Sequence, residues 1–217
     1  MTQTDPYPVC TRSERIADGV MHVAGVAFAI VGTVLLIIWA TGQTDTTTIV
    51  GLTVYGAAMI ASFVASTCYH FTPWEAARPA LRRIDHAAIY VKIAGTYTPL
   101  VVMIGSVFAY GVLALVWGLA TFGVMMKLFF WGRPGRLGVA LYVGMGWLSV
   151  ALLSSLVPLI SGTALTLMVA GGLIYSIGAV VFSLDGLRFQ NAIWHGFVLV
   201  ASLCFFAAIA LAVVPQA

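Results

Sequence analysis

Seven apolar runs of about 20 residues make up most of this chain, and they constrain its fold more than any other feature. They cover roughly 19–40, 48–70, 85–104, 107–127, 137–159, 163–184 and 192–214. A helical run of this length matches the hydrocarbon thickness of a bilayer. Continuous apolar runs lack the alternation of barrel strands, and a spanning helix satisfies its own backbone hydrogen bonds. We therefore expect an all-α membrane protein, with residues 1–217 forming a single seven-helix transmembrane domain.

The composition also points to a bilayer rather than a water-soluble environment. Hydrophobic residues make up 61% of the 217 residues and charged residues 8%, and the mean hydropathy is +1.04. These values are typical of integral membrane proteins. A soluble domain and a nucleic-acid partner are not expected, so any chemistry must take place within the helix bundle.

The positive charges fall on one side of the predicted membrane. Nine of the ten cations lie in the N-terminal arm or in alternate connections: Arg12, Arg15, Arg78, Arg82, Arg83, Lys127, Arg133, Arg136 and Arg188. The opposite connections, such as 41–47 and 161–162, carry no Lys or Arg. The positive-inside rule then makes the N-terminal arm, residues 1–17, cytoplasmic. An odd number of spans puts the C-terminus outside.

Titratable groups are concentrated in residues 66–86, STCYHFTPWEAARPALRRIDH. The four histidines of the chain all lie near the cytoplasmic ends of their predicted spans: His22, His70, His86 and His195. Residues 71–84 form the connector between the second and third spans. In it Thr72, Pro73 and Glu75 have the spacing of a capping box, which predicts a short helix in the membrane interface.

A metal site can form from residues of three different spans at this depth. His70, Asp85 and His195 offer imidazole and carboxylate ligands, which zinc prefers, and a catalytic zinc site leaves one position open. Ser66 lies on the face of His70, roughly 6 Å deeper in the bilayer. The alternative is that the histidines are interfacial residues bonded to lipid headgroups or backbone carbonyls.

Lys92 is the one cation that falls inside a predicted span. It follows Asp85 by seven residues, which puts it on nearly the same helix face and roughly 10 Å deeper. Two interpretations remain open. The side chain either extends back toward the cytoplasmic surface, or its amine pairs with Asp85 or with a substrate.

Three segments carry a resemblance to a known family: STCYH, RRIDHAAIYVKIAGTYTP and NAIWHGFVLVAS. They resemble the hemolysin III family, the bacterial branch related to the progestin and adipoQ receptors and, more distantly, to alkaline ceramidases. The resemblance covers essentially the whole chain and implies a seven-span protein of the bacterial inner membrane with zinc near its cytoplasmic face. It also implies that His70 and His195 are ligands, that Asp85 holds the metal-bound water, and that Ser66 is the nearby serine.

The chain departs from the family pattern at Asn191, where the first histidine of a seventh-helix pair is expected. An amide oxygen is a poor replacement for imidazole on zinc. The third ligand therefore stays open: Asp85 enters the coordination sphere, His86 or His22 supplies a nitrogen, or the site is weak or vacant. We expect His22 to matter less for metal binding than His70 and His195.

Two classes of function fit these features, and both involve a membrane lipid. The first is a zinc-dependent hydrolase of a membrane lipid, with an amide as one candidate bond, in which Asp85 accepts a proton and Ser66 donates a hydrogen bond. The second is a non-enzymatic lipid sensor or receptor-like protein with a closed, structural metal site. A lytic protein lacks support, since neither a secretion signal nor an amphipathic pore segment is present. A transporter would leave most of its path without ionisable groups.

Overall fold

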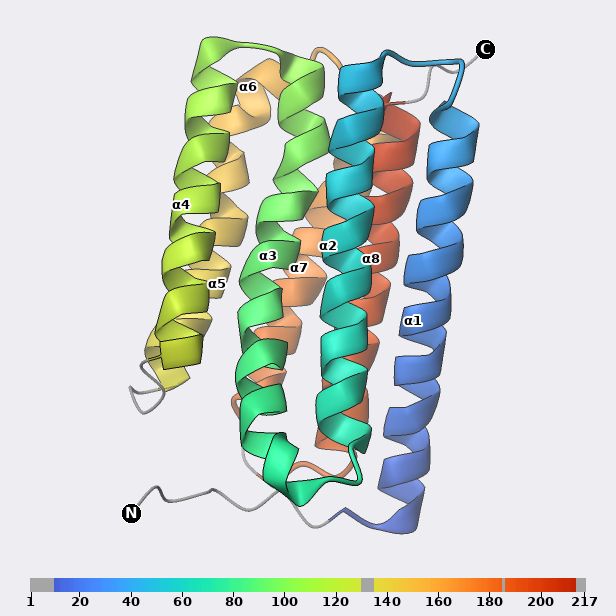
Figure 1. The fold of residues 1–217 in the computed structure, drawn as a ribbon. Coiled ribbons are helices and arrows are strands. Elements are labelled where there is room, and N and C mark those ends of the chain that lie inside the picture. The colour runs from blue at the N-terminus through green and yellow to red at the C-terminus, as the bar shows by residue number, and fades with distance from the viewer. Residues whose placement is uncertain (1–9, 130–134, 185, 214–217) are drawn as a thin grey trace.

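The computed structural model describes residues 10–129, 135–184 and 186–213, with the side chains of 135–139 excluded. Over these residues the chain is helical and has no strand, which confirms the all-α class. The elements form a bundle of roughly parallel and antiparallel helices (Figure 1). Their bounds are α1 (Arg12–Ala40), α2 (Thr46–Phe71), η1 (Glu75–Ala77), α3 (Arg78–Ile104), α4 (Val107–Phe129), α5 (Gly135–Trp147), η2 (Leu148–Leu152), α6 (Leu153–Leu156), α7 (Gly162–Phe182) and α8 (Gln190–Val213).

Six of the described helices are long and apolar enough to cross a bilayer, namely α1, α2, α3 with η1, α4, α7 and α8. The remaining predicted span, 137–159, is divided among α5, η2 and α6. These three pieces follow one another from one end of the bundle to the other beside α4 (Figure 1). The described residues therefore contain six candidate spans and one shorter apolar segment, Ala140–Leu156, and the count of seven spans stays a prediction.

The break between α5 and η2 has one local cause and one contact from another helix. Gly144 and Gly146 weaken the helix where it ends, because glycine disfavours a helix interior by about 1 kcal/mol relative to alanine. The Tyr97 hydroxyl of α3 lies 2.7 Å from the carbonyl oxygen of Met145 and 2.8 Å from that of Gly146. These carbonyls would otherwise accept bonds within a continued α-helix. Tyr97 thus stabilises the tighter 3₁₀ turn at this position.

The bundle core lies on both sides of α3. One buried cluster joins α1, α2 and α8 through residues such as Leu52, Met59 and Ile209. A second joins α3, α4 and α5 through Tyr90 and Met145, among others. The helices α2 and α3 approach closely at Gly95, where an added Cβ would lie 2.5 Å from the Cβ of Ala58. This contact fixes α3 against the helix that carries Ser66 and His70.

The connector between α2 and α3 differs from the interfacial helix that we predicted. Its only helical piece is the single turn η1, and α3 already begins at Arg78. Glu75 does not complete a capping box but pairs with Arg78, whose Nη2 lies 2.9 Å from Glu75 Oε1. Arg78 Nη2 also donates to the Thr72 carbonyl at 3.0 Å. Arg78 thereby donates to a backbone carbonyl at the end of α2, and a capping box in the connector would have left that carbonyl without this donor.

Lys92 is buried in the bundle, with 8% of its surface exposed. Its Nζ donates to Ser202 Oγ of α8 at 2.8 Å and lies 4.3 Å from the centre of the Phe63 ring. Ser202 Oγ is also 2.9 Å from the Tyr175 hydroxyl of α7. The amine therefore neither extends to the surface nor pairs with Asp85, and its partners come from three other helices.

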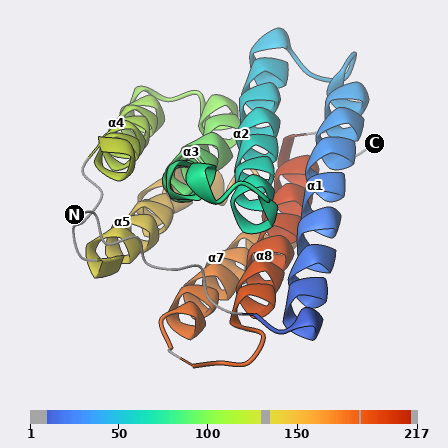
Figure 2. The same cartoon turned by 60° about the horizontal axis from the view of Figure 1, so that its bottom comes forward.

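Apart from Lys92, the described cations gather at one end of the bundle, where α1, α3 and α8 begin and α2 and α4 finish (Figures 1 and 2). We call this the cation-rich end. It carries Arg12, Arg15, Arg78, Arg82, Arg83, Lys127 and Arg188. The last turn of α8 lies at the opposite end. This arrangement agrees with the charge asymmetry from which we predicted the topology.

Reporter fusions test that topology. A reporter fused within residues 72–77 is expected to be cytoplasmic, because the cation-rich end should face inward. A reporter fused after Val213 is expected to be outside, and one fused at residues 42–45 serves as a second outer control. A cytoplasmic signal from the C-terminal fusion would contradict both the orientation and the seventh crossing.

Candidate metal centre

Four side chains that can bind a metal meet at the cation-rich end of the bundle. Asp18 and His22 come from α1, His70 from α2 and His195 from α8. One ligand atom from each lies within 4.8 Å of the others. The three imidazole rings are mutual neighbours, with ring centres 4.1 Å apart for His22 and His195 and 4.6 Å apart for His70 and His195.

The local sequence explains why α1 presents two of these residues. Asp18 and His22 are four residues apart, so they share one helix face. The helix starts with a capping box, in which the Thr11 hydroxyl accepts a bond from the Glu14 amide and the Glu14 carboxylate accepts one from the Thr11 amide. The second oxygen of Glu14 accepts a bond from the Phe189 amide at 3.1 Å, just before α8. This link holds the start of α1 beside the helix that carries His195.

Asp18 binds the Nδ1 side of all three histidines. Its Oδ1 lies 2.6 Å from His195 Nδ1 and 3.4 Å from His22 Nδ1, and its Oδ2 lies 3.2 Å from His70 Nδ1. The carboxylate is 4% exposed. A buried carboxylate requires compensating positive charge and hydrogen bonds. A protonated imidazole or a bound cation must therefore accompany Asp18.

The Nε2 atoms of two histidines point to the opposite side of the group, toward Ser66. Ser66 Oγ lies 3.2 Å from His22 Nε2 and 3.3 Å from His195 Nε2. His22 Nδ1 lies 2.8 Å from the Asp18 carbonyl, which can only accept, so this nitrogen carries the hydrogen. His195 Nδ1 likewise donates to the carboxylate. In neutral rings, both Nε2 atoms then present lone pairs to one serine.

A serine hydroxyl has one proton and can satisfy only one of those two lone pairs. The second lone pair needs another donor or a cation. The three imidazoles and one carboxylate are also the donor types that zinc prefers. The residues therefore fit a metal ion.

Two sets of donor atoms can hold that ion. On the Nε2 side the imidazoles are ligands, while Asp18 orients them through Nδ1, as carboxylates commonly do for metal-binding histidines. On the Nδ1 side Asp18 is itself a fourth ligand, and four protein ligands close a zinc site. The choice between these two sets decides whether a position stays open for chemistry.

The residues singled out from the sequence take different places. His70 and His195 belong to the group, and Ser66 contacts it. Asp85 is not one of the four, although it is close enough for its charge to interact with those of His70 and His195. Its carboxylate lies 3.5 Å from Nδ1 of His86.

His86 and Asn191 are also outside the group of four. His86 Nδ1 instead bonds to the Arg82 carbonyl at 2.8 Å. Asn191 is half-buried on α8, one turn before His195. The position of His22 revises our expectation that it matters less, because its ring centre lies 4.1 Å from that of His195 and 5.0 Å from that of His70. Asp18 was not among the predicted site residues, and its only signal in the sequence was its four-residue spacing from His22.

Comparisons with known proteins identify the family of this chain. The sequence profile described as "Haemolysin-III related" matches residues 11–206, which is most of the chain. The chain belongs to the haemolysin-III related family. It is 36% identical over 197 residues to the Bacillus subtilis (strain 168) protein named "Hemolysin-3 homolog", covering 90% of this chain and 92% of that protein. It is 35% identical over 205 residues to "Hemolysin-3" of Bacillus cereus, covering 94% of each.

A more distant relative is human. The chain is 28% identical over 169 residues to "Monocyte to macrophage differentiation factor" of Homo sapiens, covering 72% of this chain and 67% of that protein. The matched family segment begins at residue 11 and so includes Asp18 and His22 of α1. All four residues of the metal-binding group therefore lie within the family region.

Metal analysis of purified variants tests the group. We expect substoichiometric metal in His22→Ala, His70→Ala and His195→Ala, because each loses one nitrogen donor. His86→Ala is the control and should keep its metal. Asp18→Asn should weaken binding by about 10–100-fold, since it removes the group that orients the imidazoles. Asn191→His should tighten binding if the amide weakens the site. Unchanged metal in all three alanine variants, measured by mass spectrometry, would contradict the assignment.

Proposed function

We propose that this protein is a zinc-dependent hydrolase that acts on a membrane lipid in the cytoplasmic leaflet, with an amide as the candidate scissile bond. The observation that carries the proposal is the convergence of two imidazole Nε2 atoms on a single serine, opposite the carboxylate that holds their Nδ1 atoms. When the donors are oriented in this way, one side of the metal site faces Ser66 instead of a fourth ligand.

The chain's own residues have distinct roles in this proposal. Asp18 fixes the tautomer and the orientation of the three imidazoles. Asp85, which interacts electrostatically with His70 and His195, is the proton acceptor. Ser66 donates its hydroxyl hydrogen to the oxygen on which negative charge develops during attack on a carbonyl. A zinc ion held by His22, His70 and His195 would supply Lewis acidity and make water a better nucleophile near neutral pH.

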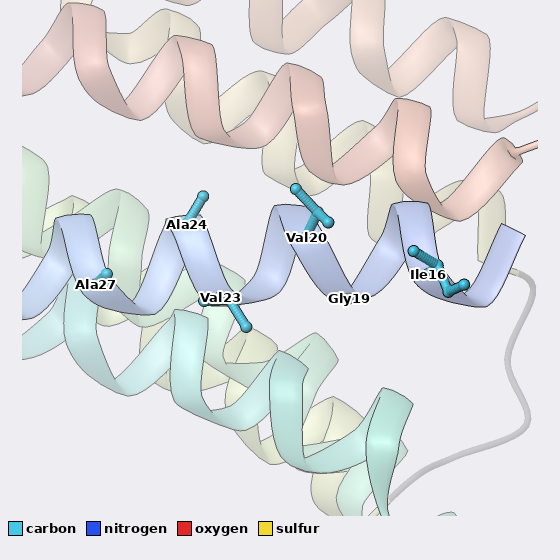
Figure 3. Close-up of a pocket in the computed structure, with 6 residues that line it drawn as sticks. All are labelled: Ile16, Gly19, Val20, Val23, Ala24 and Ala27. Carbon is cyan, nitrogen blue, oxygen red and sulfur yellow. The ribbon is translucent and has the colours of Figure 1, made fainter. Parts of the chain in front are cut away.

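The surroundings of the site suit a lipid. The outer face of α1 carries a hollow of about 480 Å³ lined by Ile16, Gly19, Val20, Val23, Ala24 and Ala27 (Figure 3). Gly19 and Val23 directly follow Asp18 and His22 in the chain. An apolar surface next to a polar site at the bundle end matches a molecule with a polar head and an apolar tail.

The second candidate is a lipid sensor with a structural metal. One observation favours it: Asp18 can serve as a fourth ligand, and a closed site has no position for a substrate. In that case binding of a lipid would alter helix packing without turnover.

Substitution of Asp85 separates the two functions. Zinc-loaded wild type and Asp85→Asn are offered ceramide-like amides and phospholipids in micelles, and hydrolysis is followed by mass spectrometry. If the protein is a hydrolase, the hydrolysis rate should fall about 10²–10⁴-fold in Asp85→Asn. The substitution removes the carboxylate that acts as the base but keeps the shape of the side chain. Asp45→Asn is the control, since Asp45 caps the opposite end of α2, and it should retain the wild-type rate.

Zinc is measured on the same samples so that loss of metal is not mistaken for loss of the base. Absence of turnover by zinc-loaded wild type on every lipid would contradict the hydrolase and leave the sensor as the better account. Equal rates in wild type and Asp85→Asn would remove Asp85 from the mechanism.

A further inference from the structure

A second feature of the cation-rich end is a hollow between the first turns of α3 and the last turn of α4. It measures about 400 Å³ and is lined by Ala76, Pro79, Ala80, Arg83, Ile84 and Leu128. Viewed from this end, α4 lies beside α3 on the side away from α1 and α2 (Figure 2). The hollow is therefore separate from the histidine group, which is built from α1, α2 and α8.

Arg83 is the charged side chain that lines this hollow. Its Nη1 donates to the Leu128 carbonyl at 3.2 Å, which satisfies one of the open carbonyls at the end of α4. A guanidinium has five N–H donors. Within the described residues, the bond to Leu128 is the one hydrogen bond that Arg83 makes, and no carboxylate there forms an ion pair with it. Most of its donors thus remain available beside the hollow.

Two further cations belong to the same helix ends as Arg83 and Leu128. Arg82 precedes Arg83 on α3, Lys127 precedes Leu128 on α4, and the side chains of Arg82 and Lys127 are near enough for their charges to repel. Within the described residues, Glu75 pairs with Arg78, and Asp85 lies 3.5 Å from Nδ1 of His86. An anion in the hollow would pair with the guanidinium of Arg83, a group that forms two-point bonds to phosphate.

Both helices that line this hollow also expose apolar side chains. Ile84 lines the hollow and is 46% exposed. Phe122, Met125 and Phe129 of α4 are also exposed, and their spacing puts them on one helix face. A ligand that fits both parts has an anionic head at the interface and an acyl chain in the bilayer.

We propose that this hollow binds the phosphate of an anionic phospholipid of the cytoplasmic leaflet, with Arg83 as the principal contact and the exposed face of α4 against an acyl chain. Basic pockets between transmembrane helices on the cytoplasmic side commonly bind such headgroups. The lipid would join α3 to α4 at the end of the bundle where the metal-binding group lies. This site is distinct from the proposed hydrolase site and does not depend on it.

Lipid titration monitored by native mass spectrometry tests the proposal. Full-length protein in a neutral detergent is titrated with phosphatidylglycerol or with phosphatidylcholine of the same acyl chains. We expect tighter binding of phosphatidylglycerol, weakened about fivefold or more in Arg83→Gln, since one cation near a headgroup contributes about this factor. Arg83→Lys keeps the charge but loses the two-point bonding of the guanidinium. Its affinity for phosphatidylglycerol should therefore lie between those of the wild type and Arg83→Gln. Arg12→Gln, at the exposed start of α1, is the matched control and should bind as wild type does.

A second variant keeps the test decisive if Arg83→Gln does not fold. Ala80 is exposed and lines the hollow one turn before Arg83. Ala80→Glu would therefore introduce a competing carboxylate without removing a contact, and it should also lose phosphatidylglycerol selectivity. The proposal is overturned by wild-type binding in Ala80→Glu or in folded Arg83→Gln, by equal loss in Arg12→Gln, or by equal binding of the two lipids. Displacement of phosphatidylglycerol by an equal concentration of glycerol phosphate would show a site for a soluble anion instead.

Discussion

The buried carboxylate of Asp18 is the constraint on which the arrangement of this end of the molecule depends. It accepts from Nδ1 of His195 at 2.6 Å and lies 3.2 Å from Nδ1 of His70, so one side chain of α1 joins α2 to α8. A carboxylate that is 4% exposed is costly unless it is paired. The buried carboxylate therefore needs the histidines as partners, and it in turn holds the histidines in place. The same contacts turn two Nε2 atoms toward Ser66, which creates the candidate metal site.

The polar groups follow the distribution of charge across the bundle. The metal-binding group, the Arg83 hollow and the described arginines all lie at the cation-rich end, where a polar headgroup would be found. Lys92 is the exception, since its amine is buried among α2, α7 and α8 and bonds to Ser202. An intramembrane lysine of this kind is expensive to bury. Its contacts stabilise the core between the site and the far end of the bundle.

Much of the fold was predictable because its determinants are local. Apolar runs of about 20 residues set the helices, and their bounds in the structure are close to those runs except at α1, α3 and α5. The break in α5 depends on Tyr97, which comes from another helix and is distant in sequence from Met145 and Gly146. The early start of α3 depends on Arg78 bonding back to Glu75 and Thr72. Hydrophobic periodicity specifies neither the contact between helices at Tyr97 nor the local contacts of Arg78.

The site was predictable in part for the same reason. Helix ends put His70 and His195 at one depth, and the four-residue spacing put Ser66 on the face of His70. They could not fix which face of α1 turns inward, because that rotation is set by packing and by the Glu14 contact with the Phe189 amide. The sequence therefore did not indicate Asp18 as a site residue, and it indicated His22 less strongly than His70 and His195. In the structure Asp85 lies within α3 and does not begin a helix, and it is outside the group of four. It still interacts with the charges of His70 and His195.

X-ray absorption spectroscopy of the purified, metal-loaded protein tests the central claim most directly. The account predicts zinc with nitrogen and oxygen ligands near 2.0–2.1 Å and the multiple-scattering pattern of three imidazoles, reduced to two in His22→Ala. Sulfur ligands near 2.3 Å, or an imidazole count that does not change in His22→Ala, would contradict the claim that α1 supplies a ligand and that Asp18 organises the site.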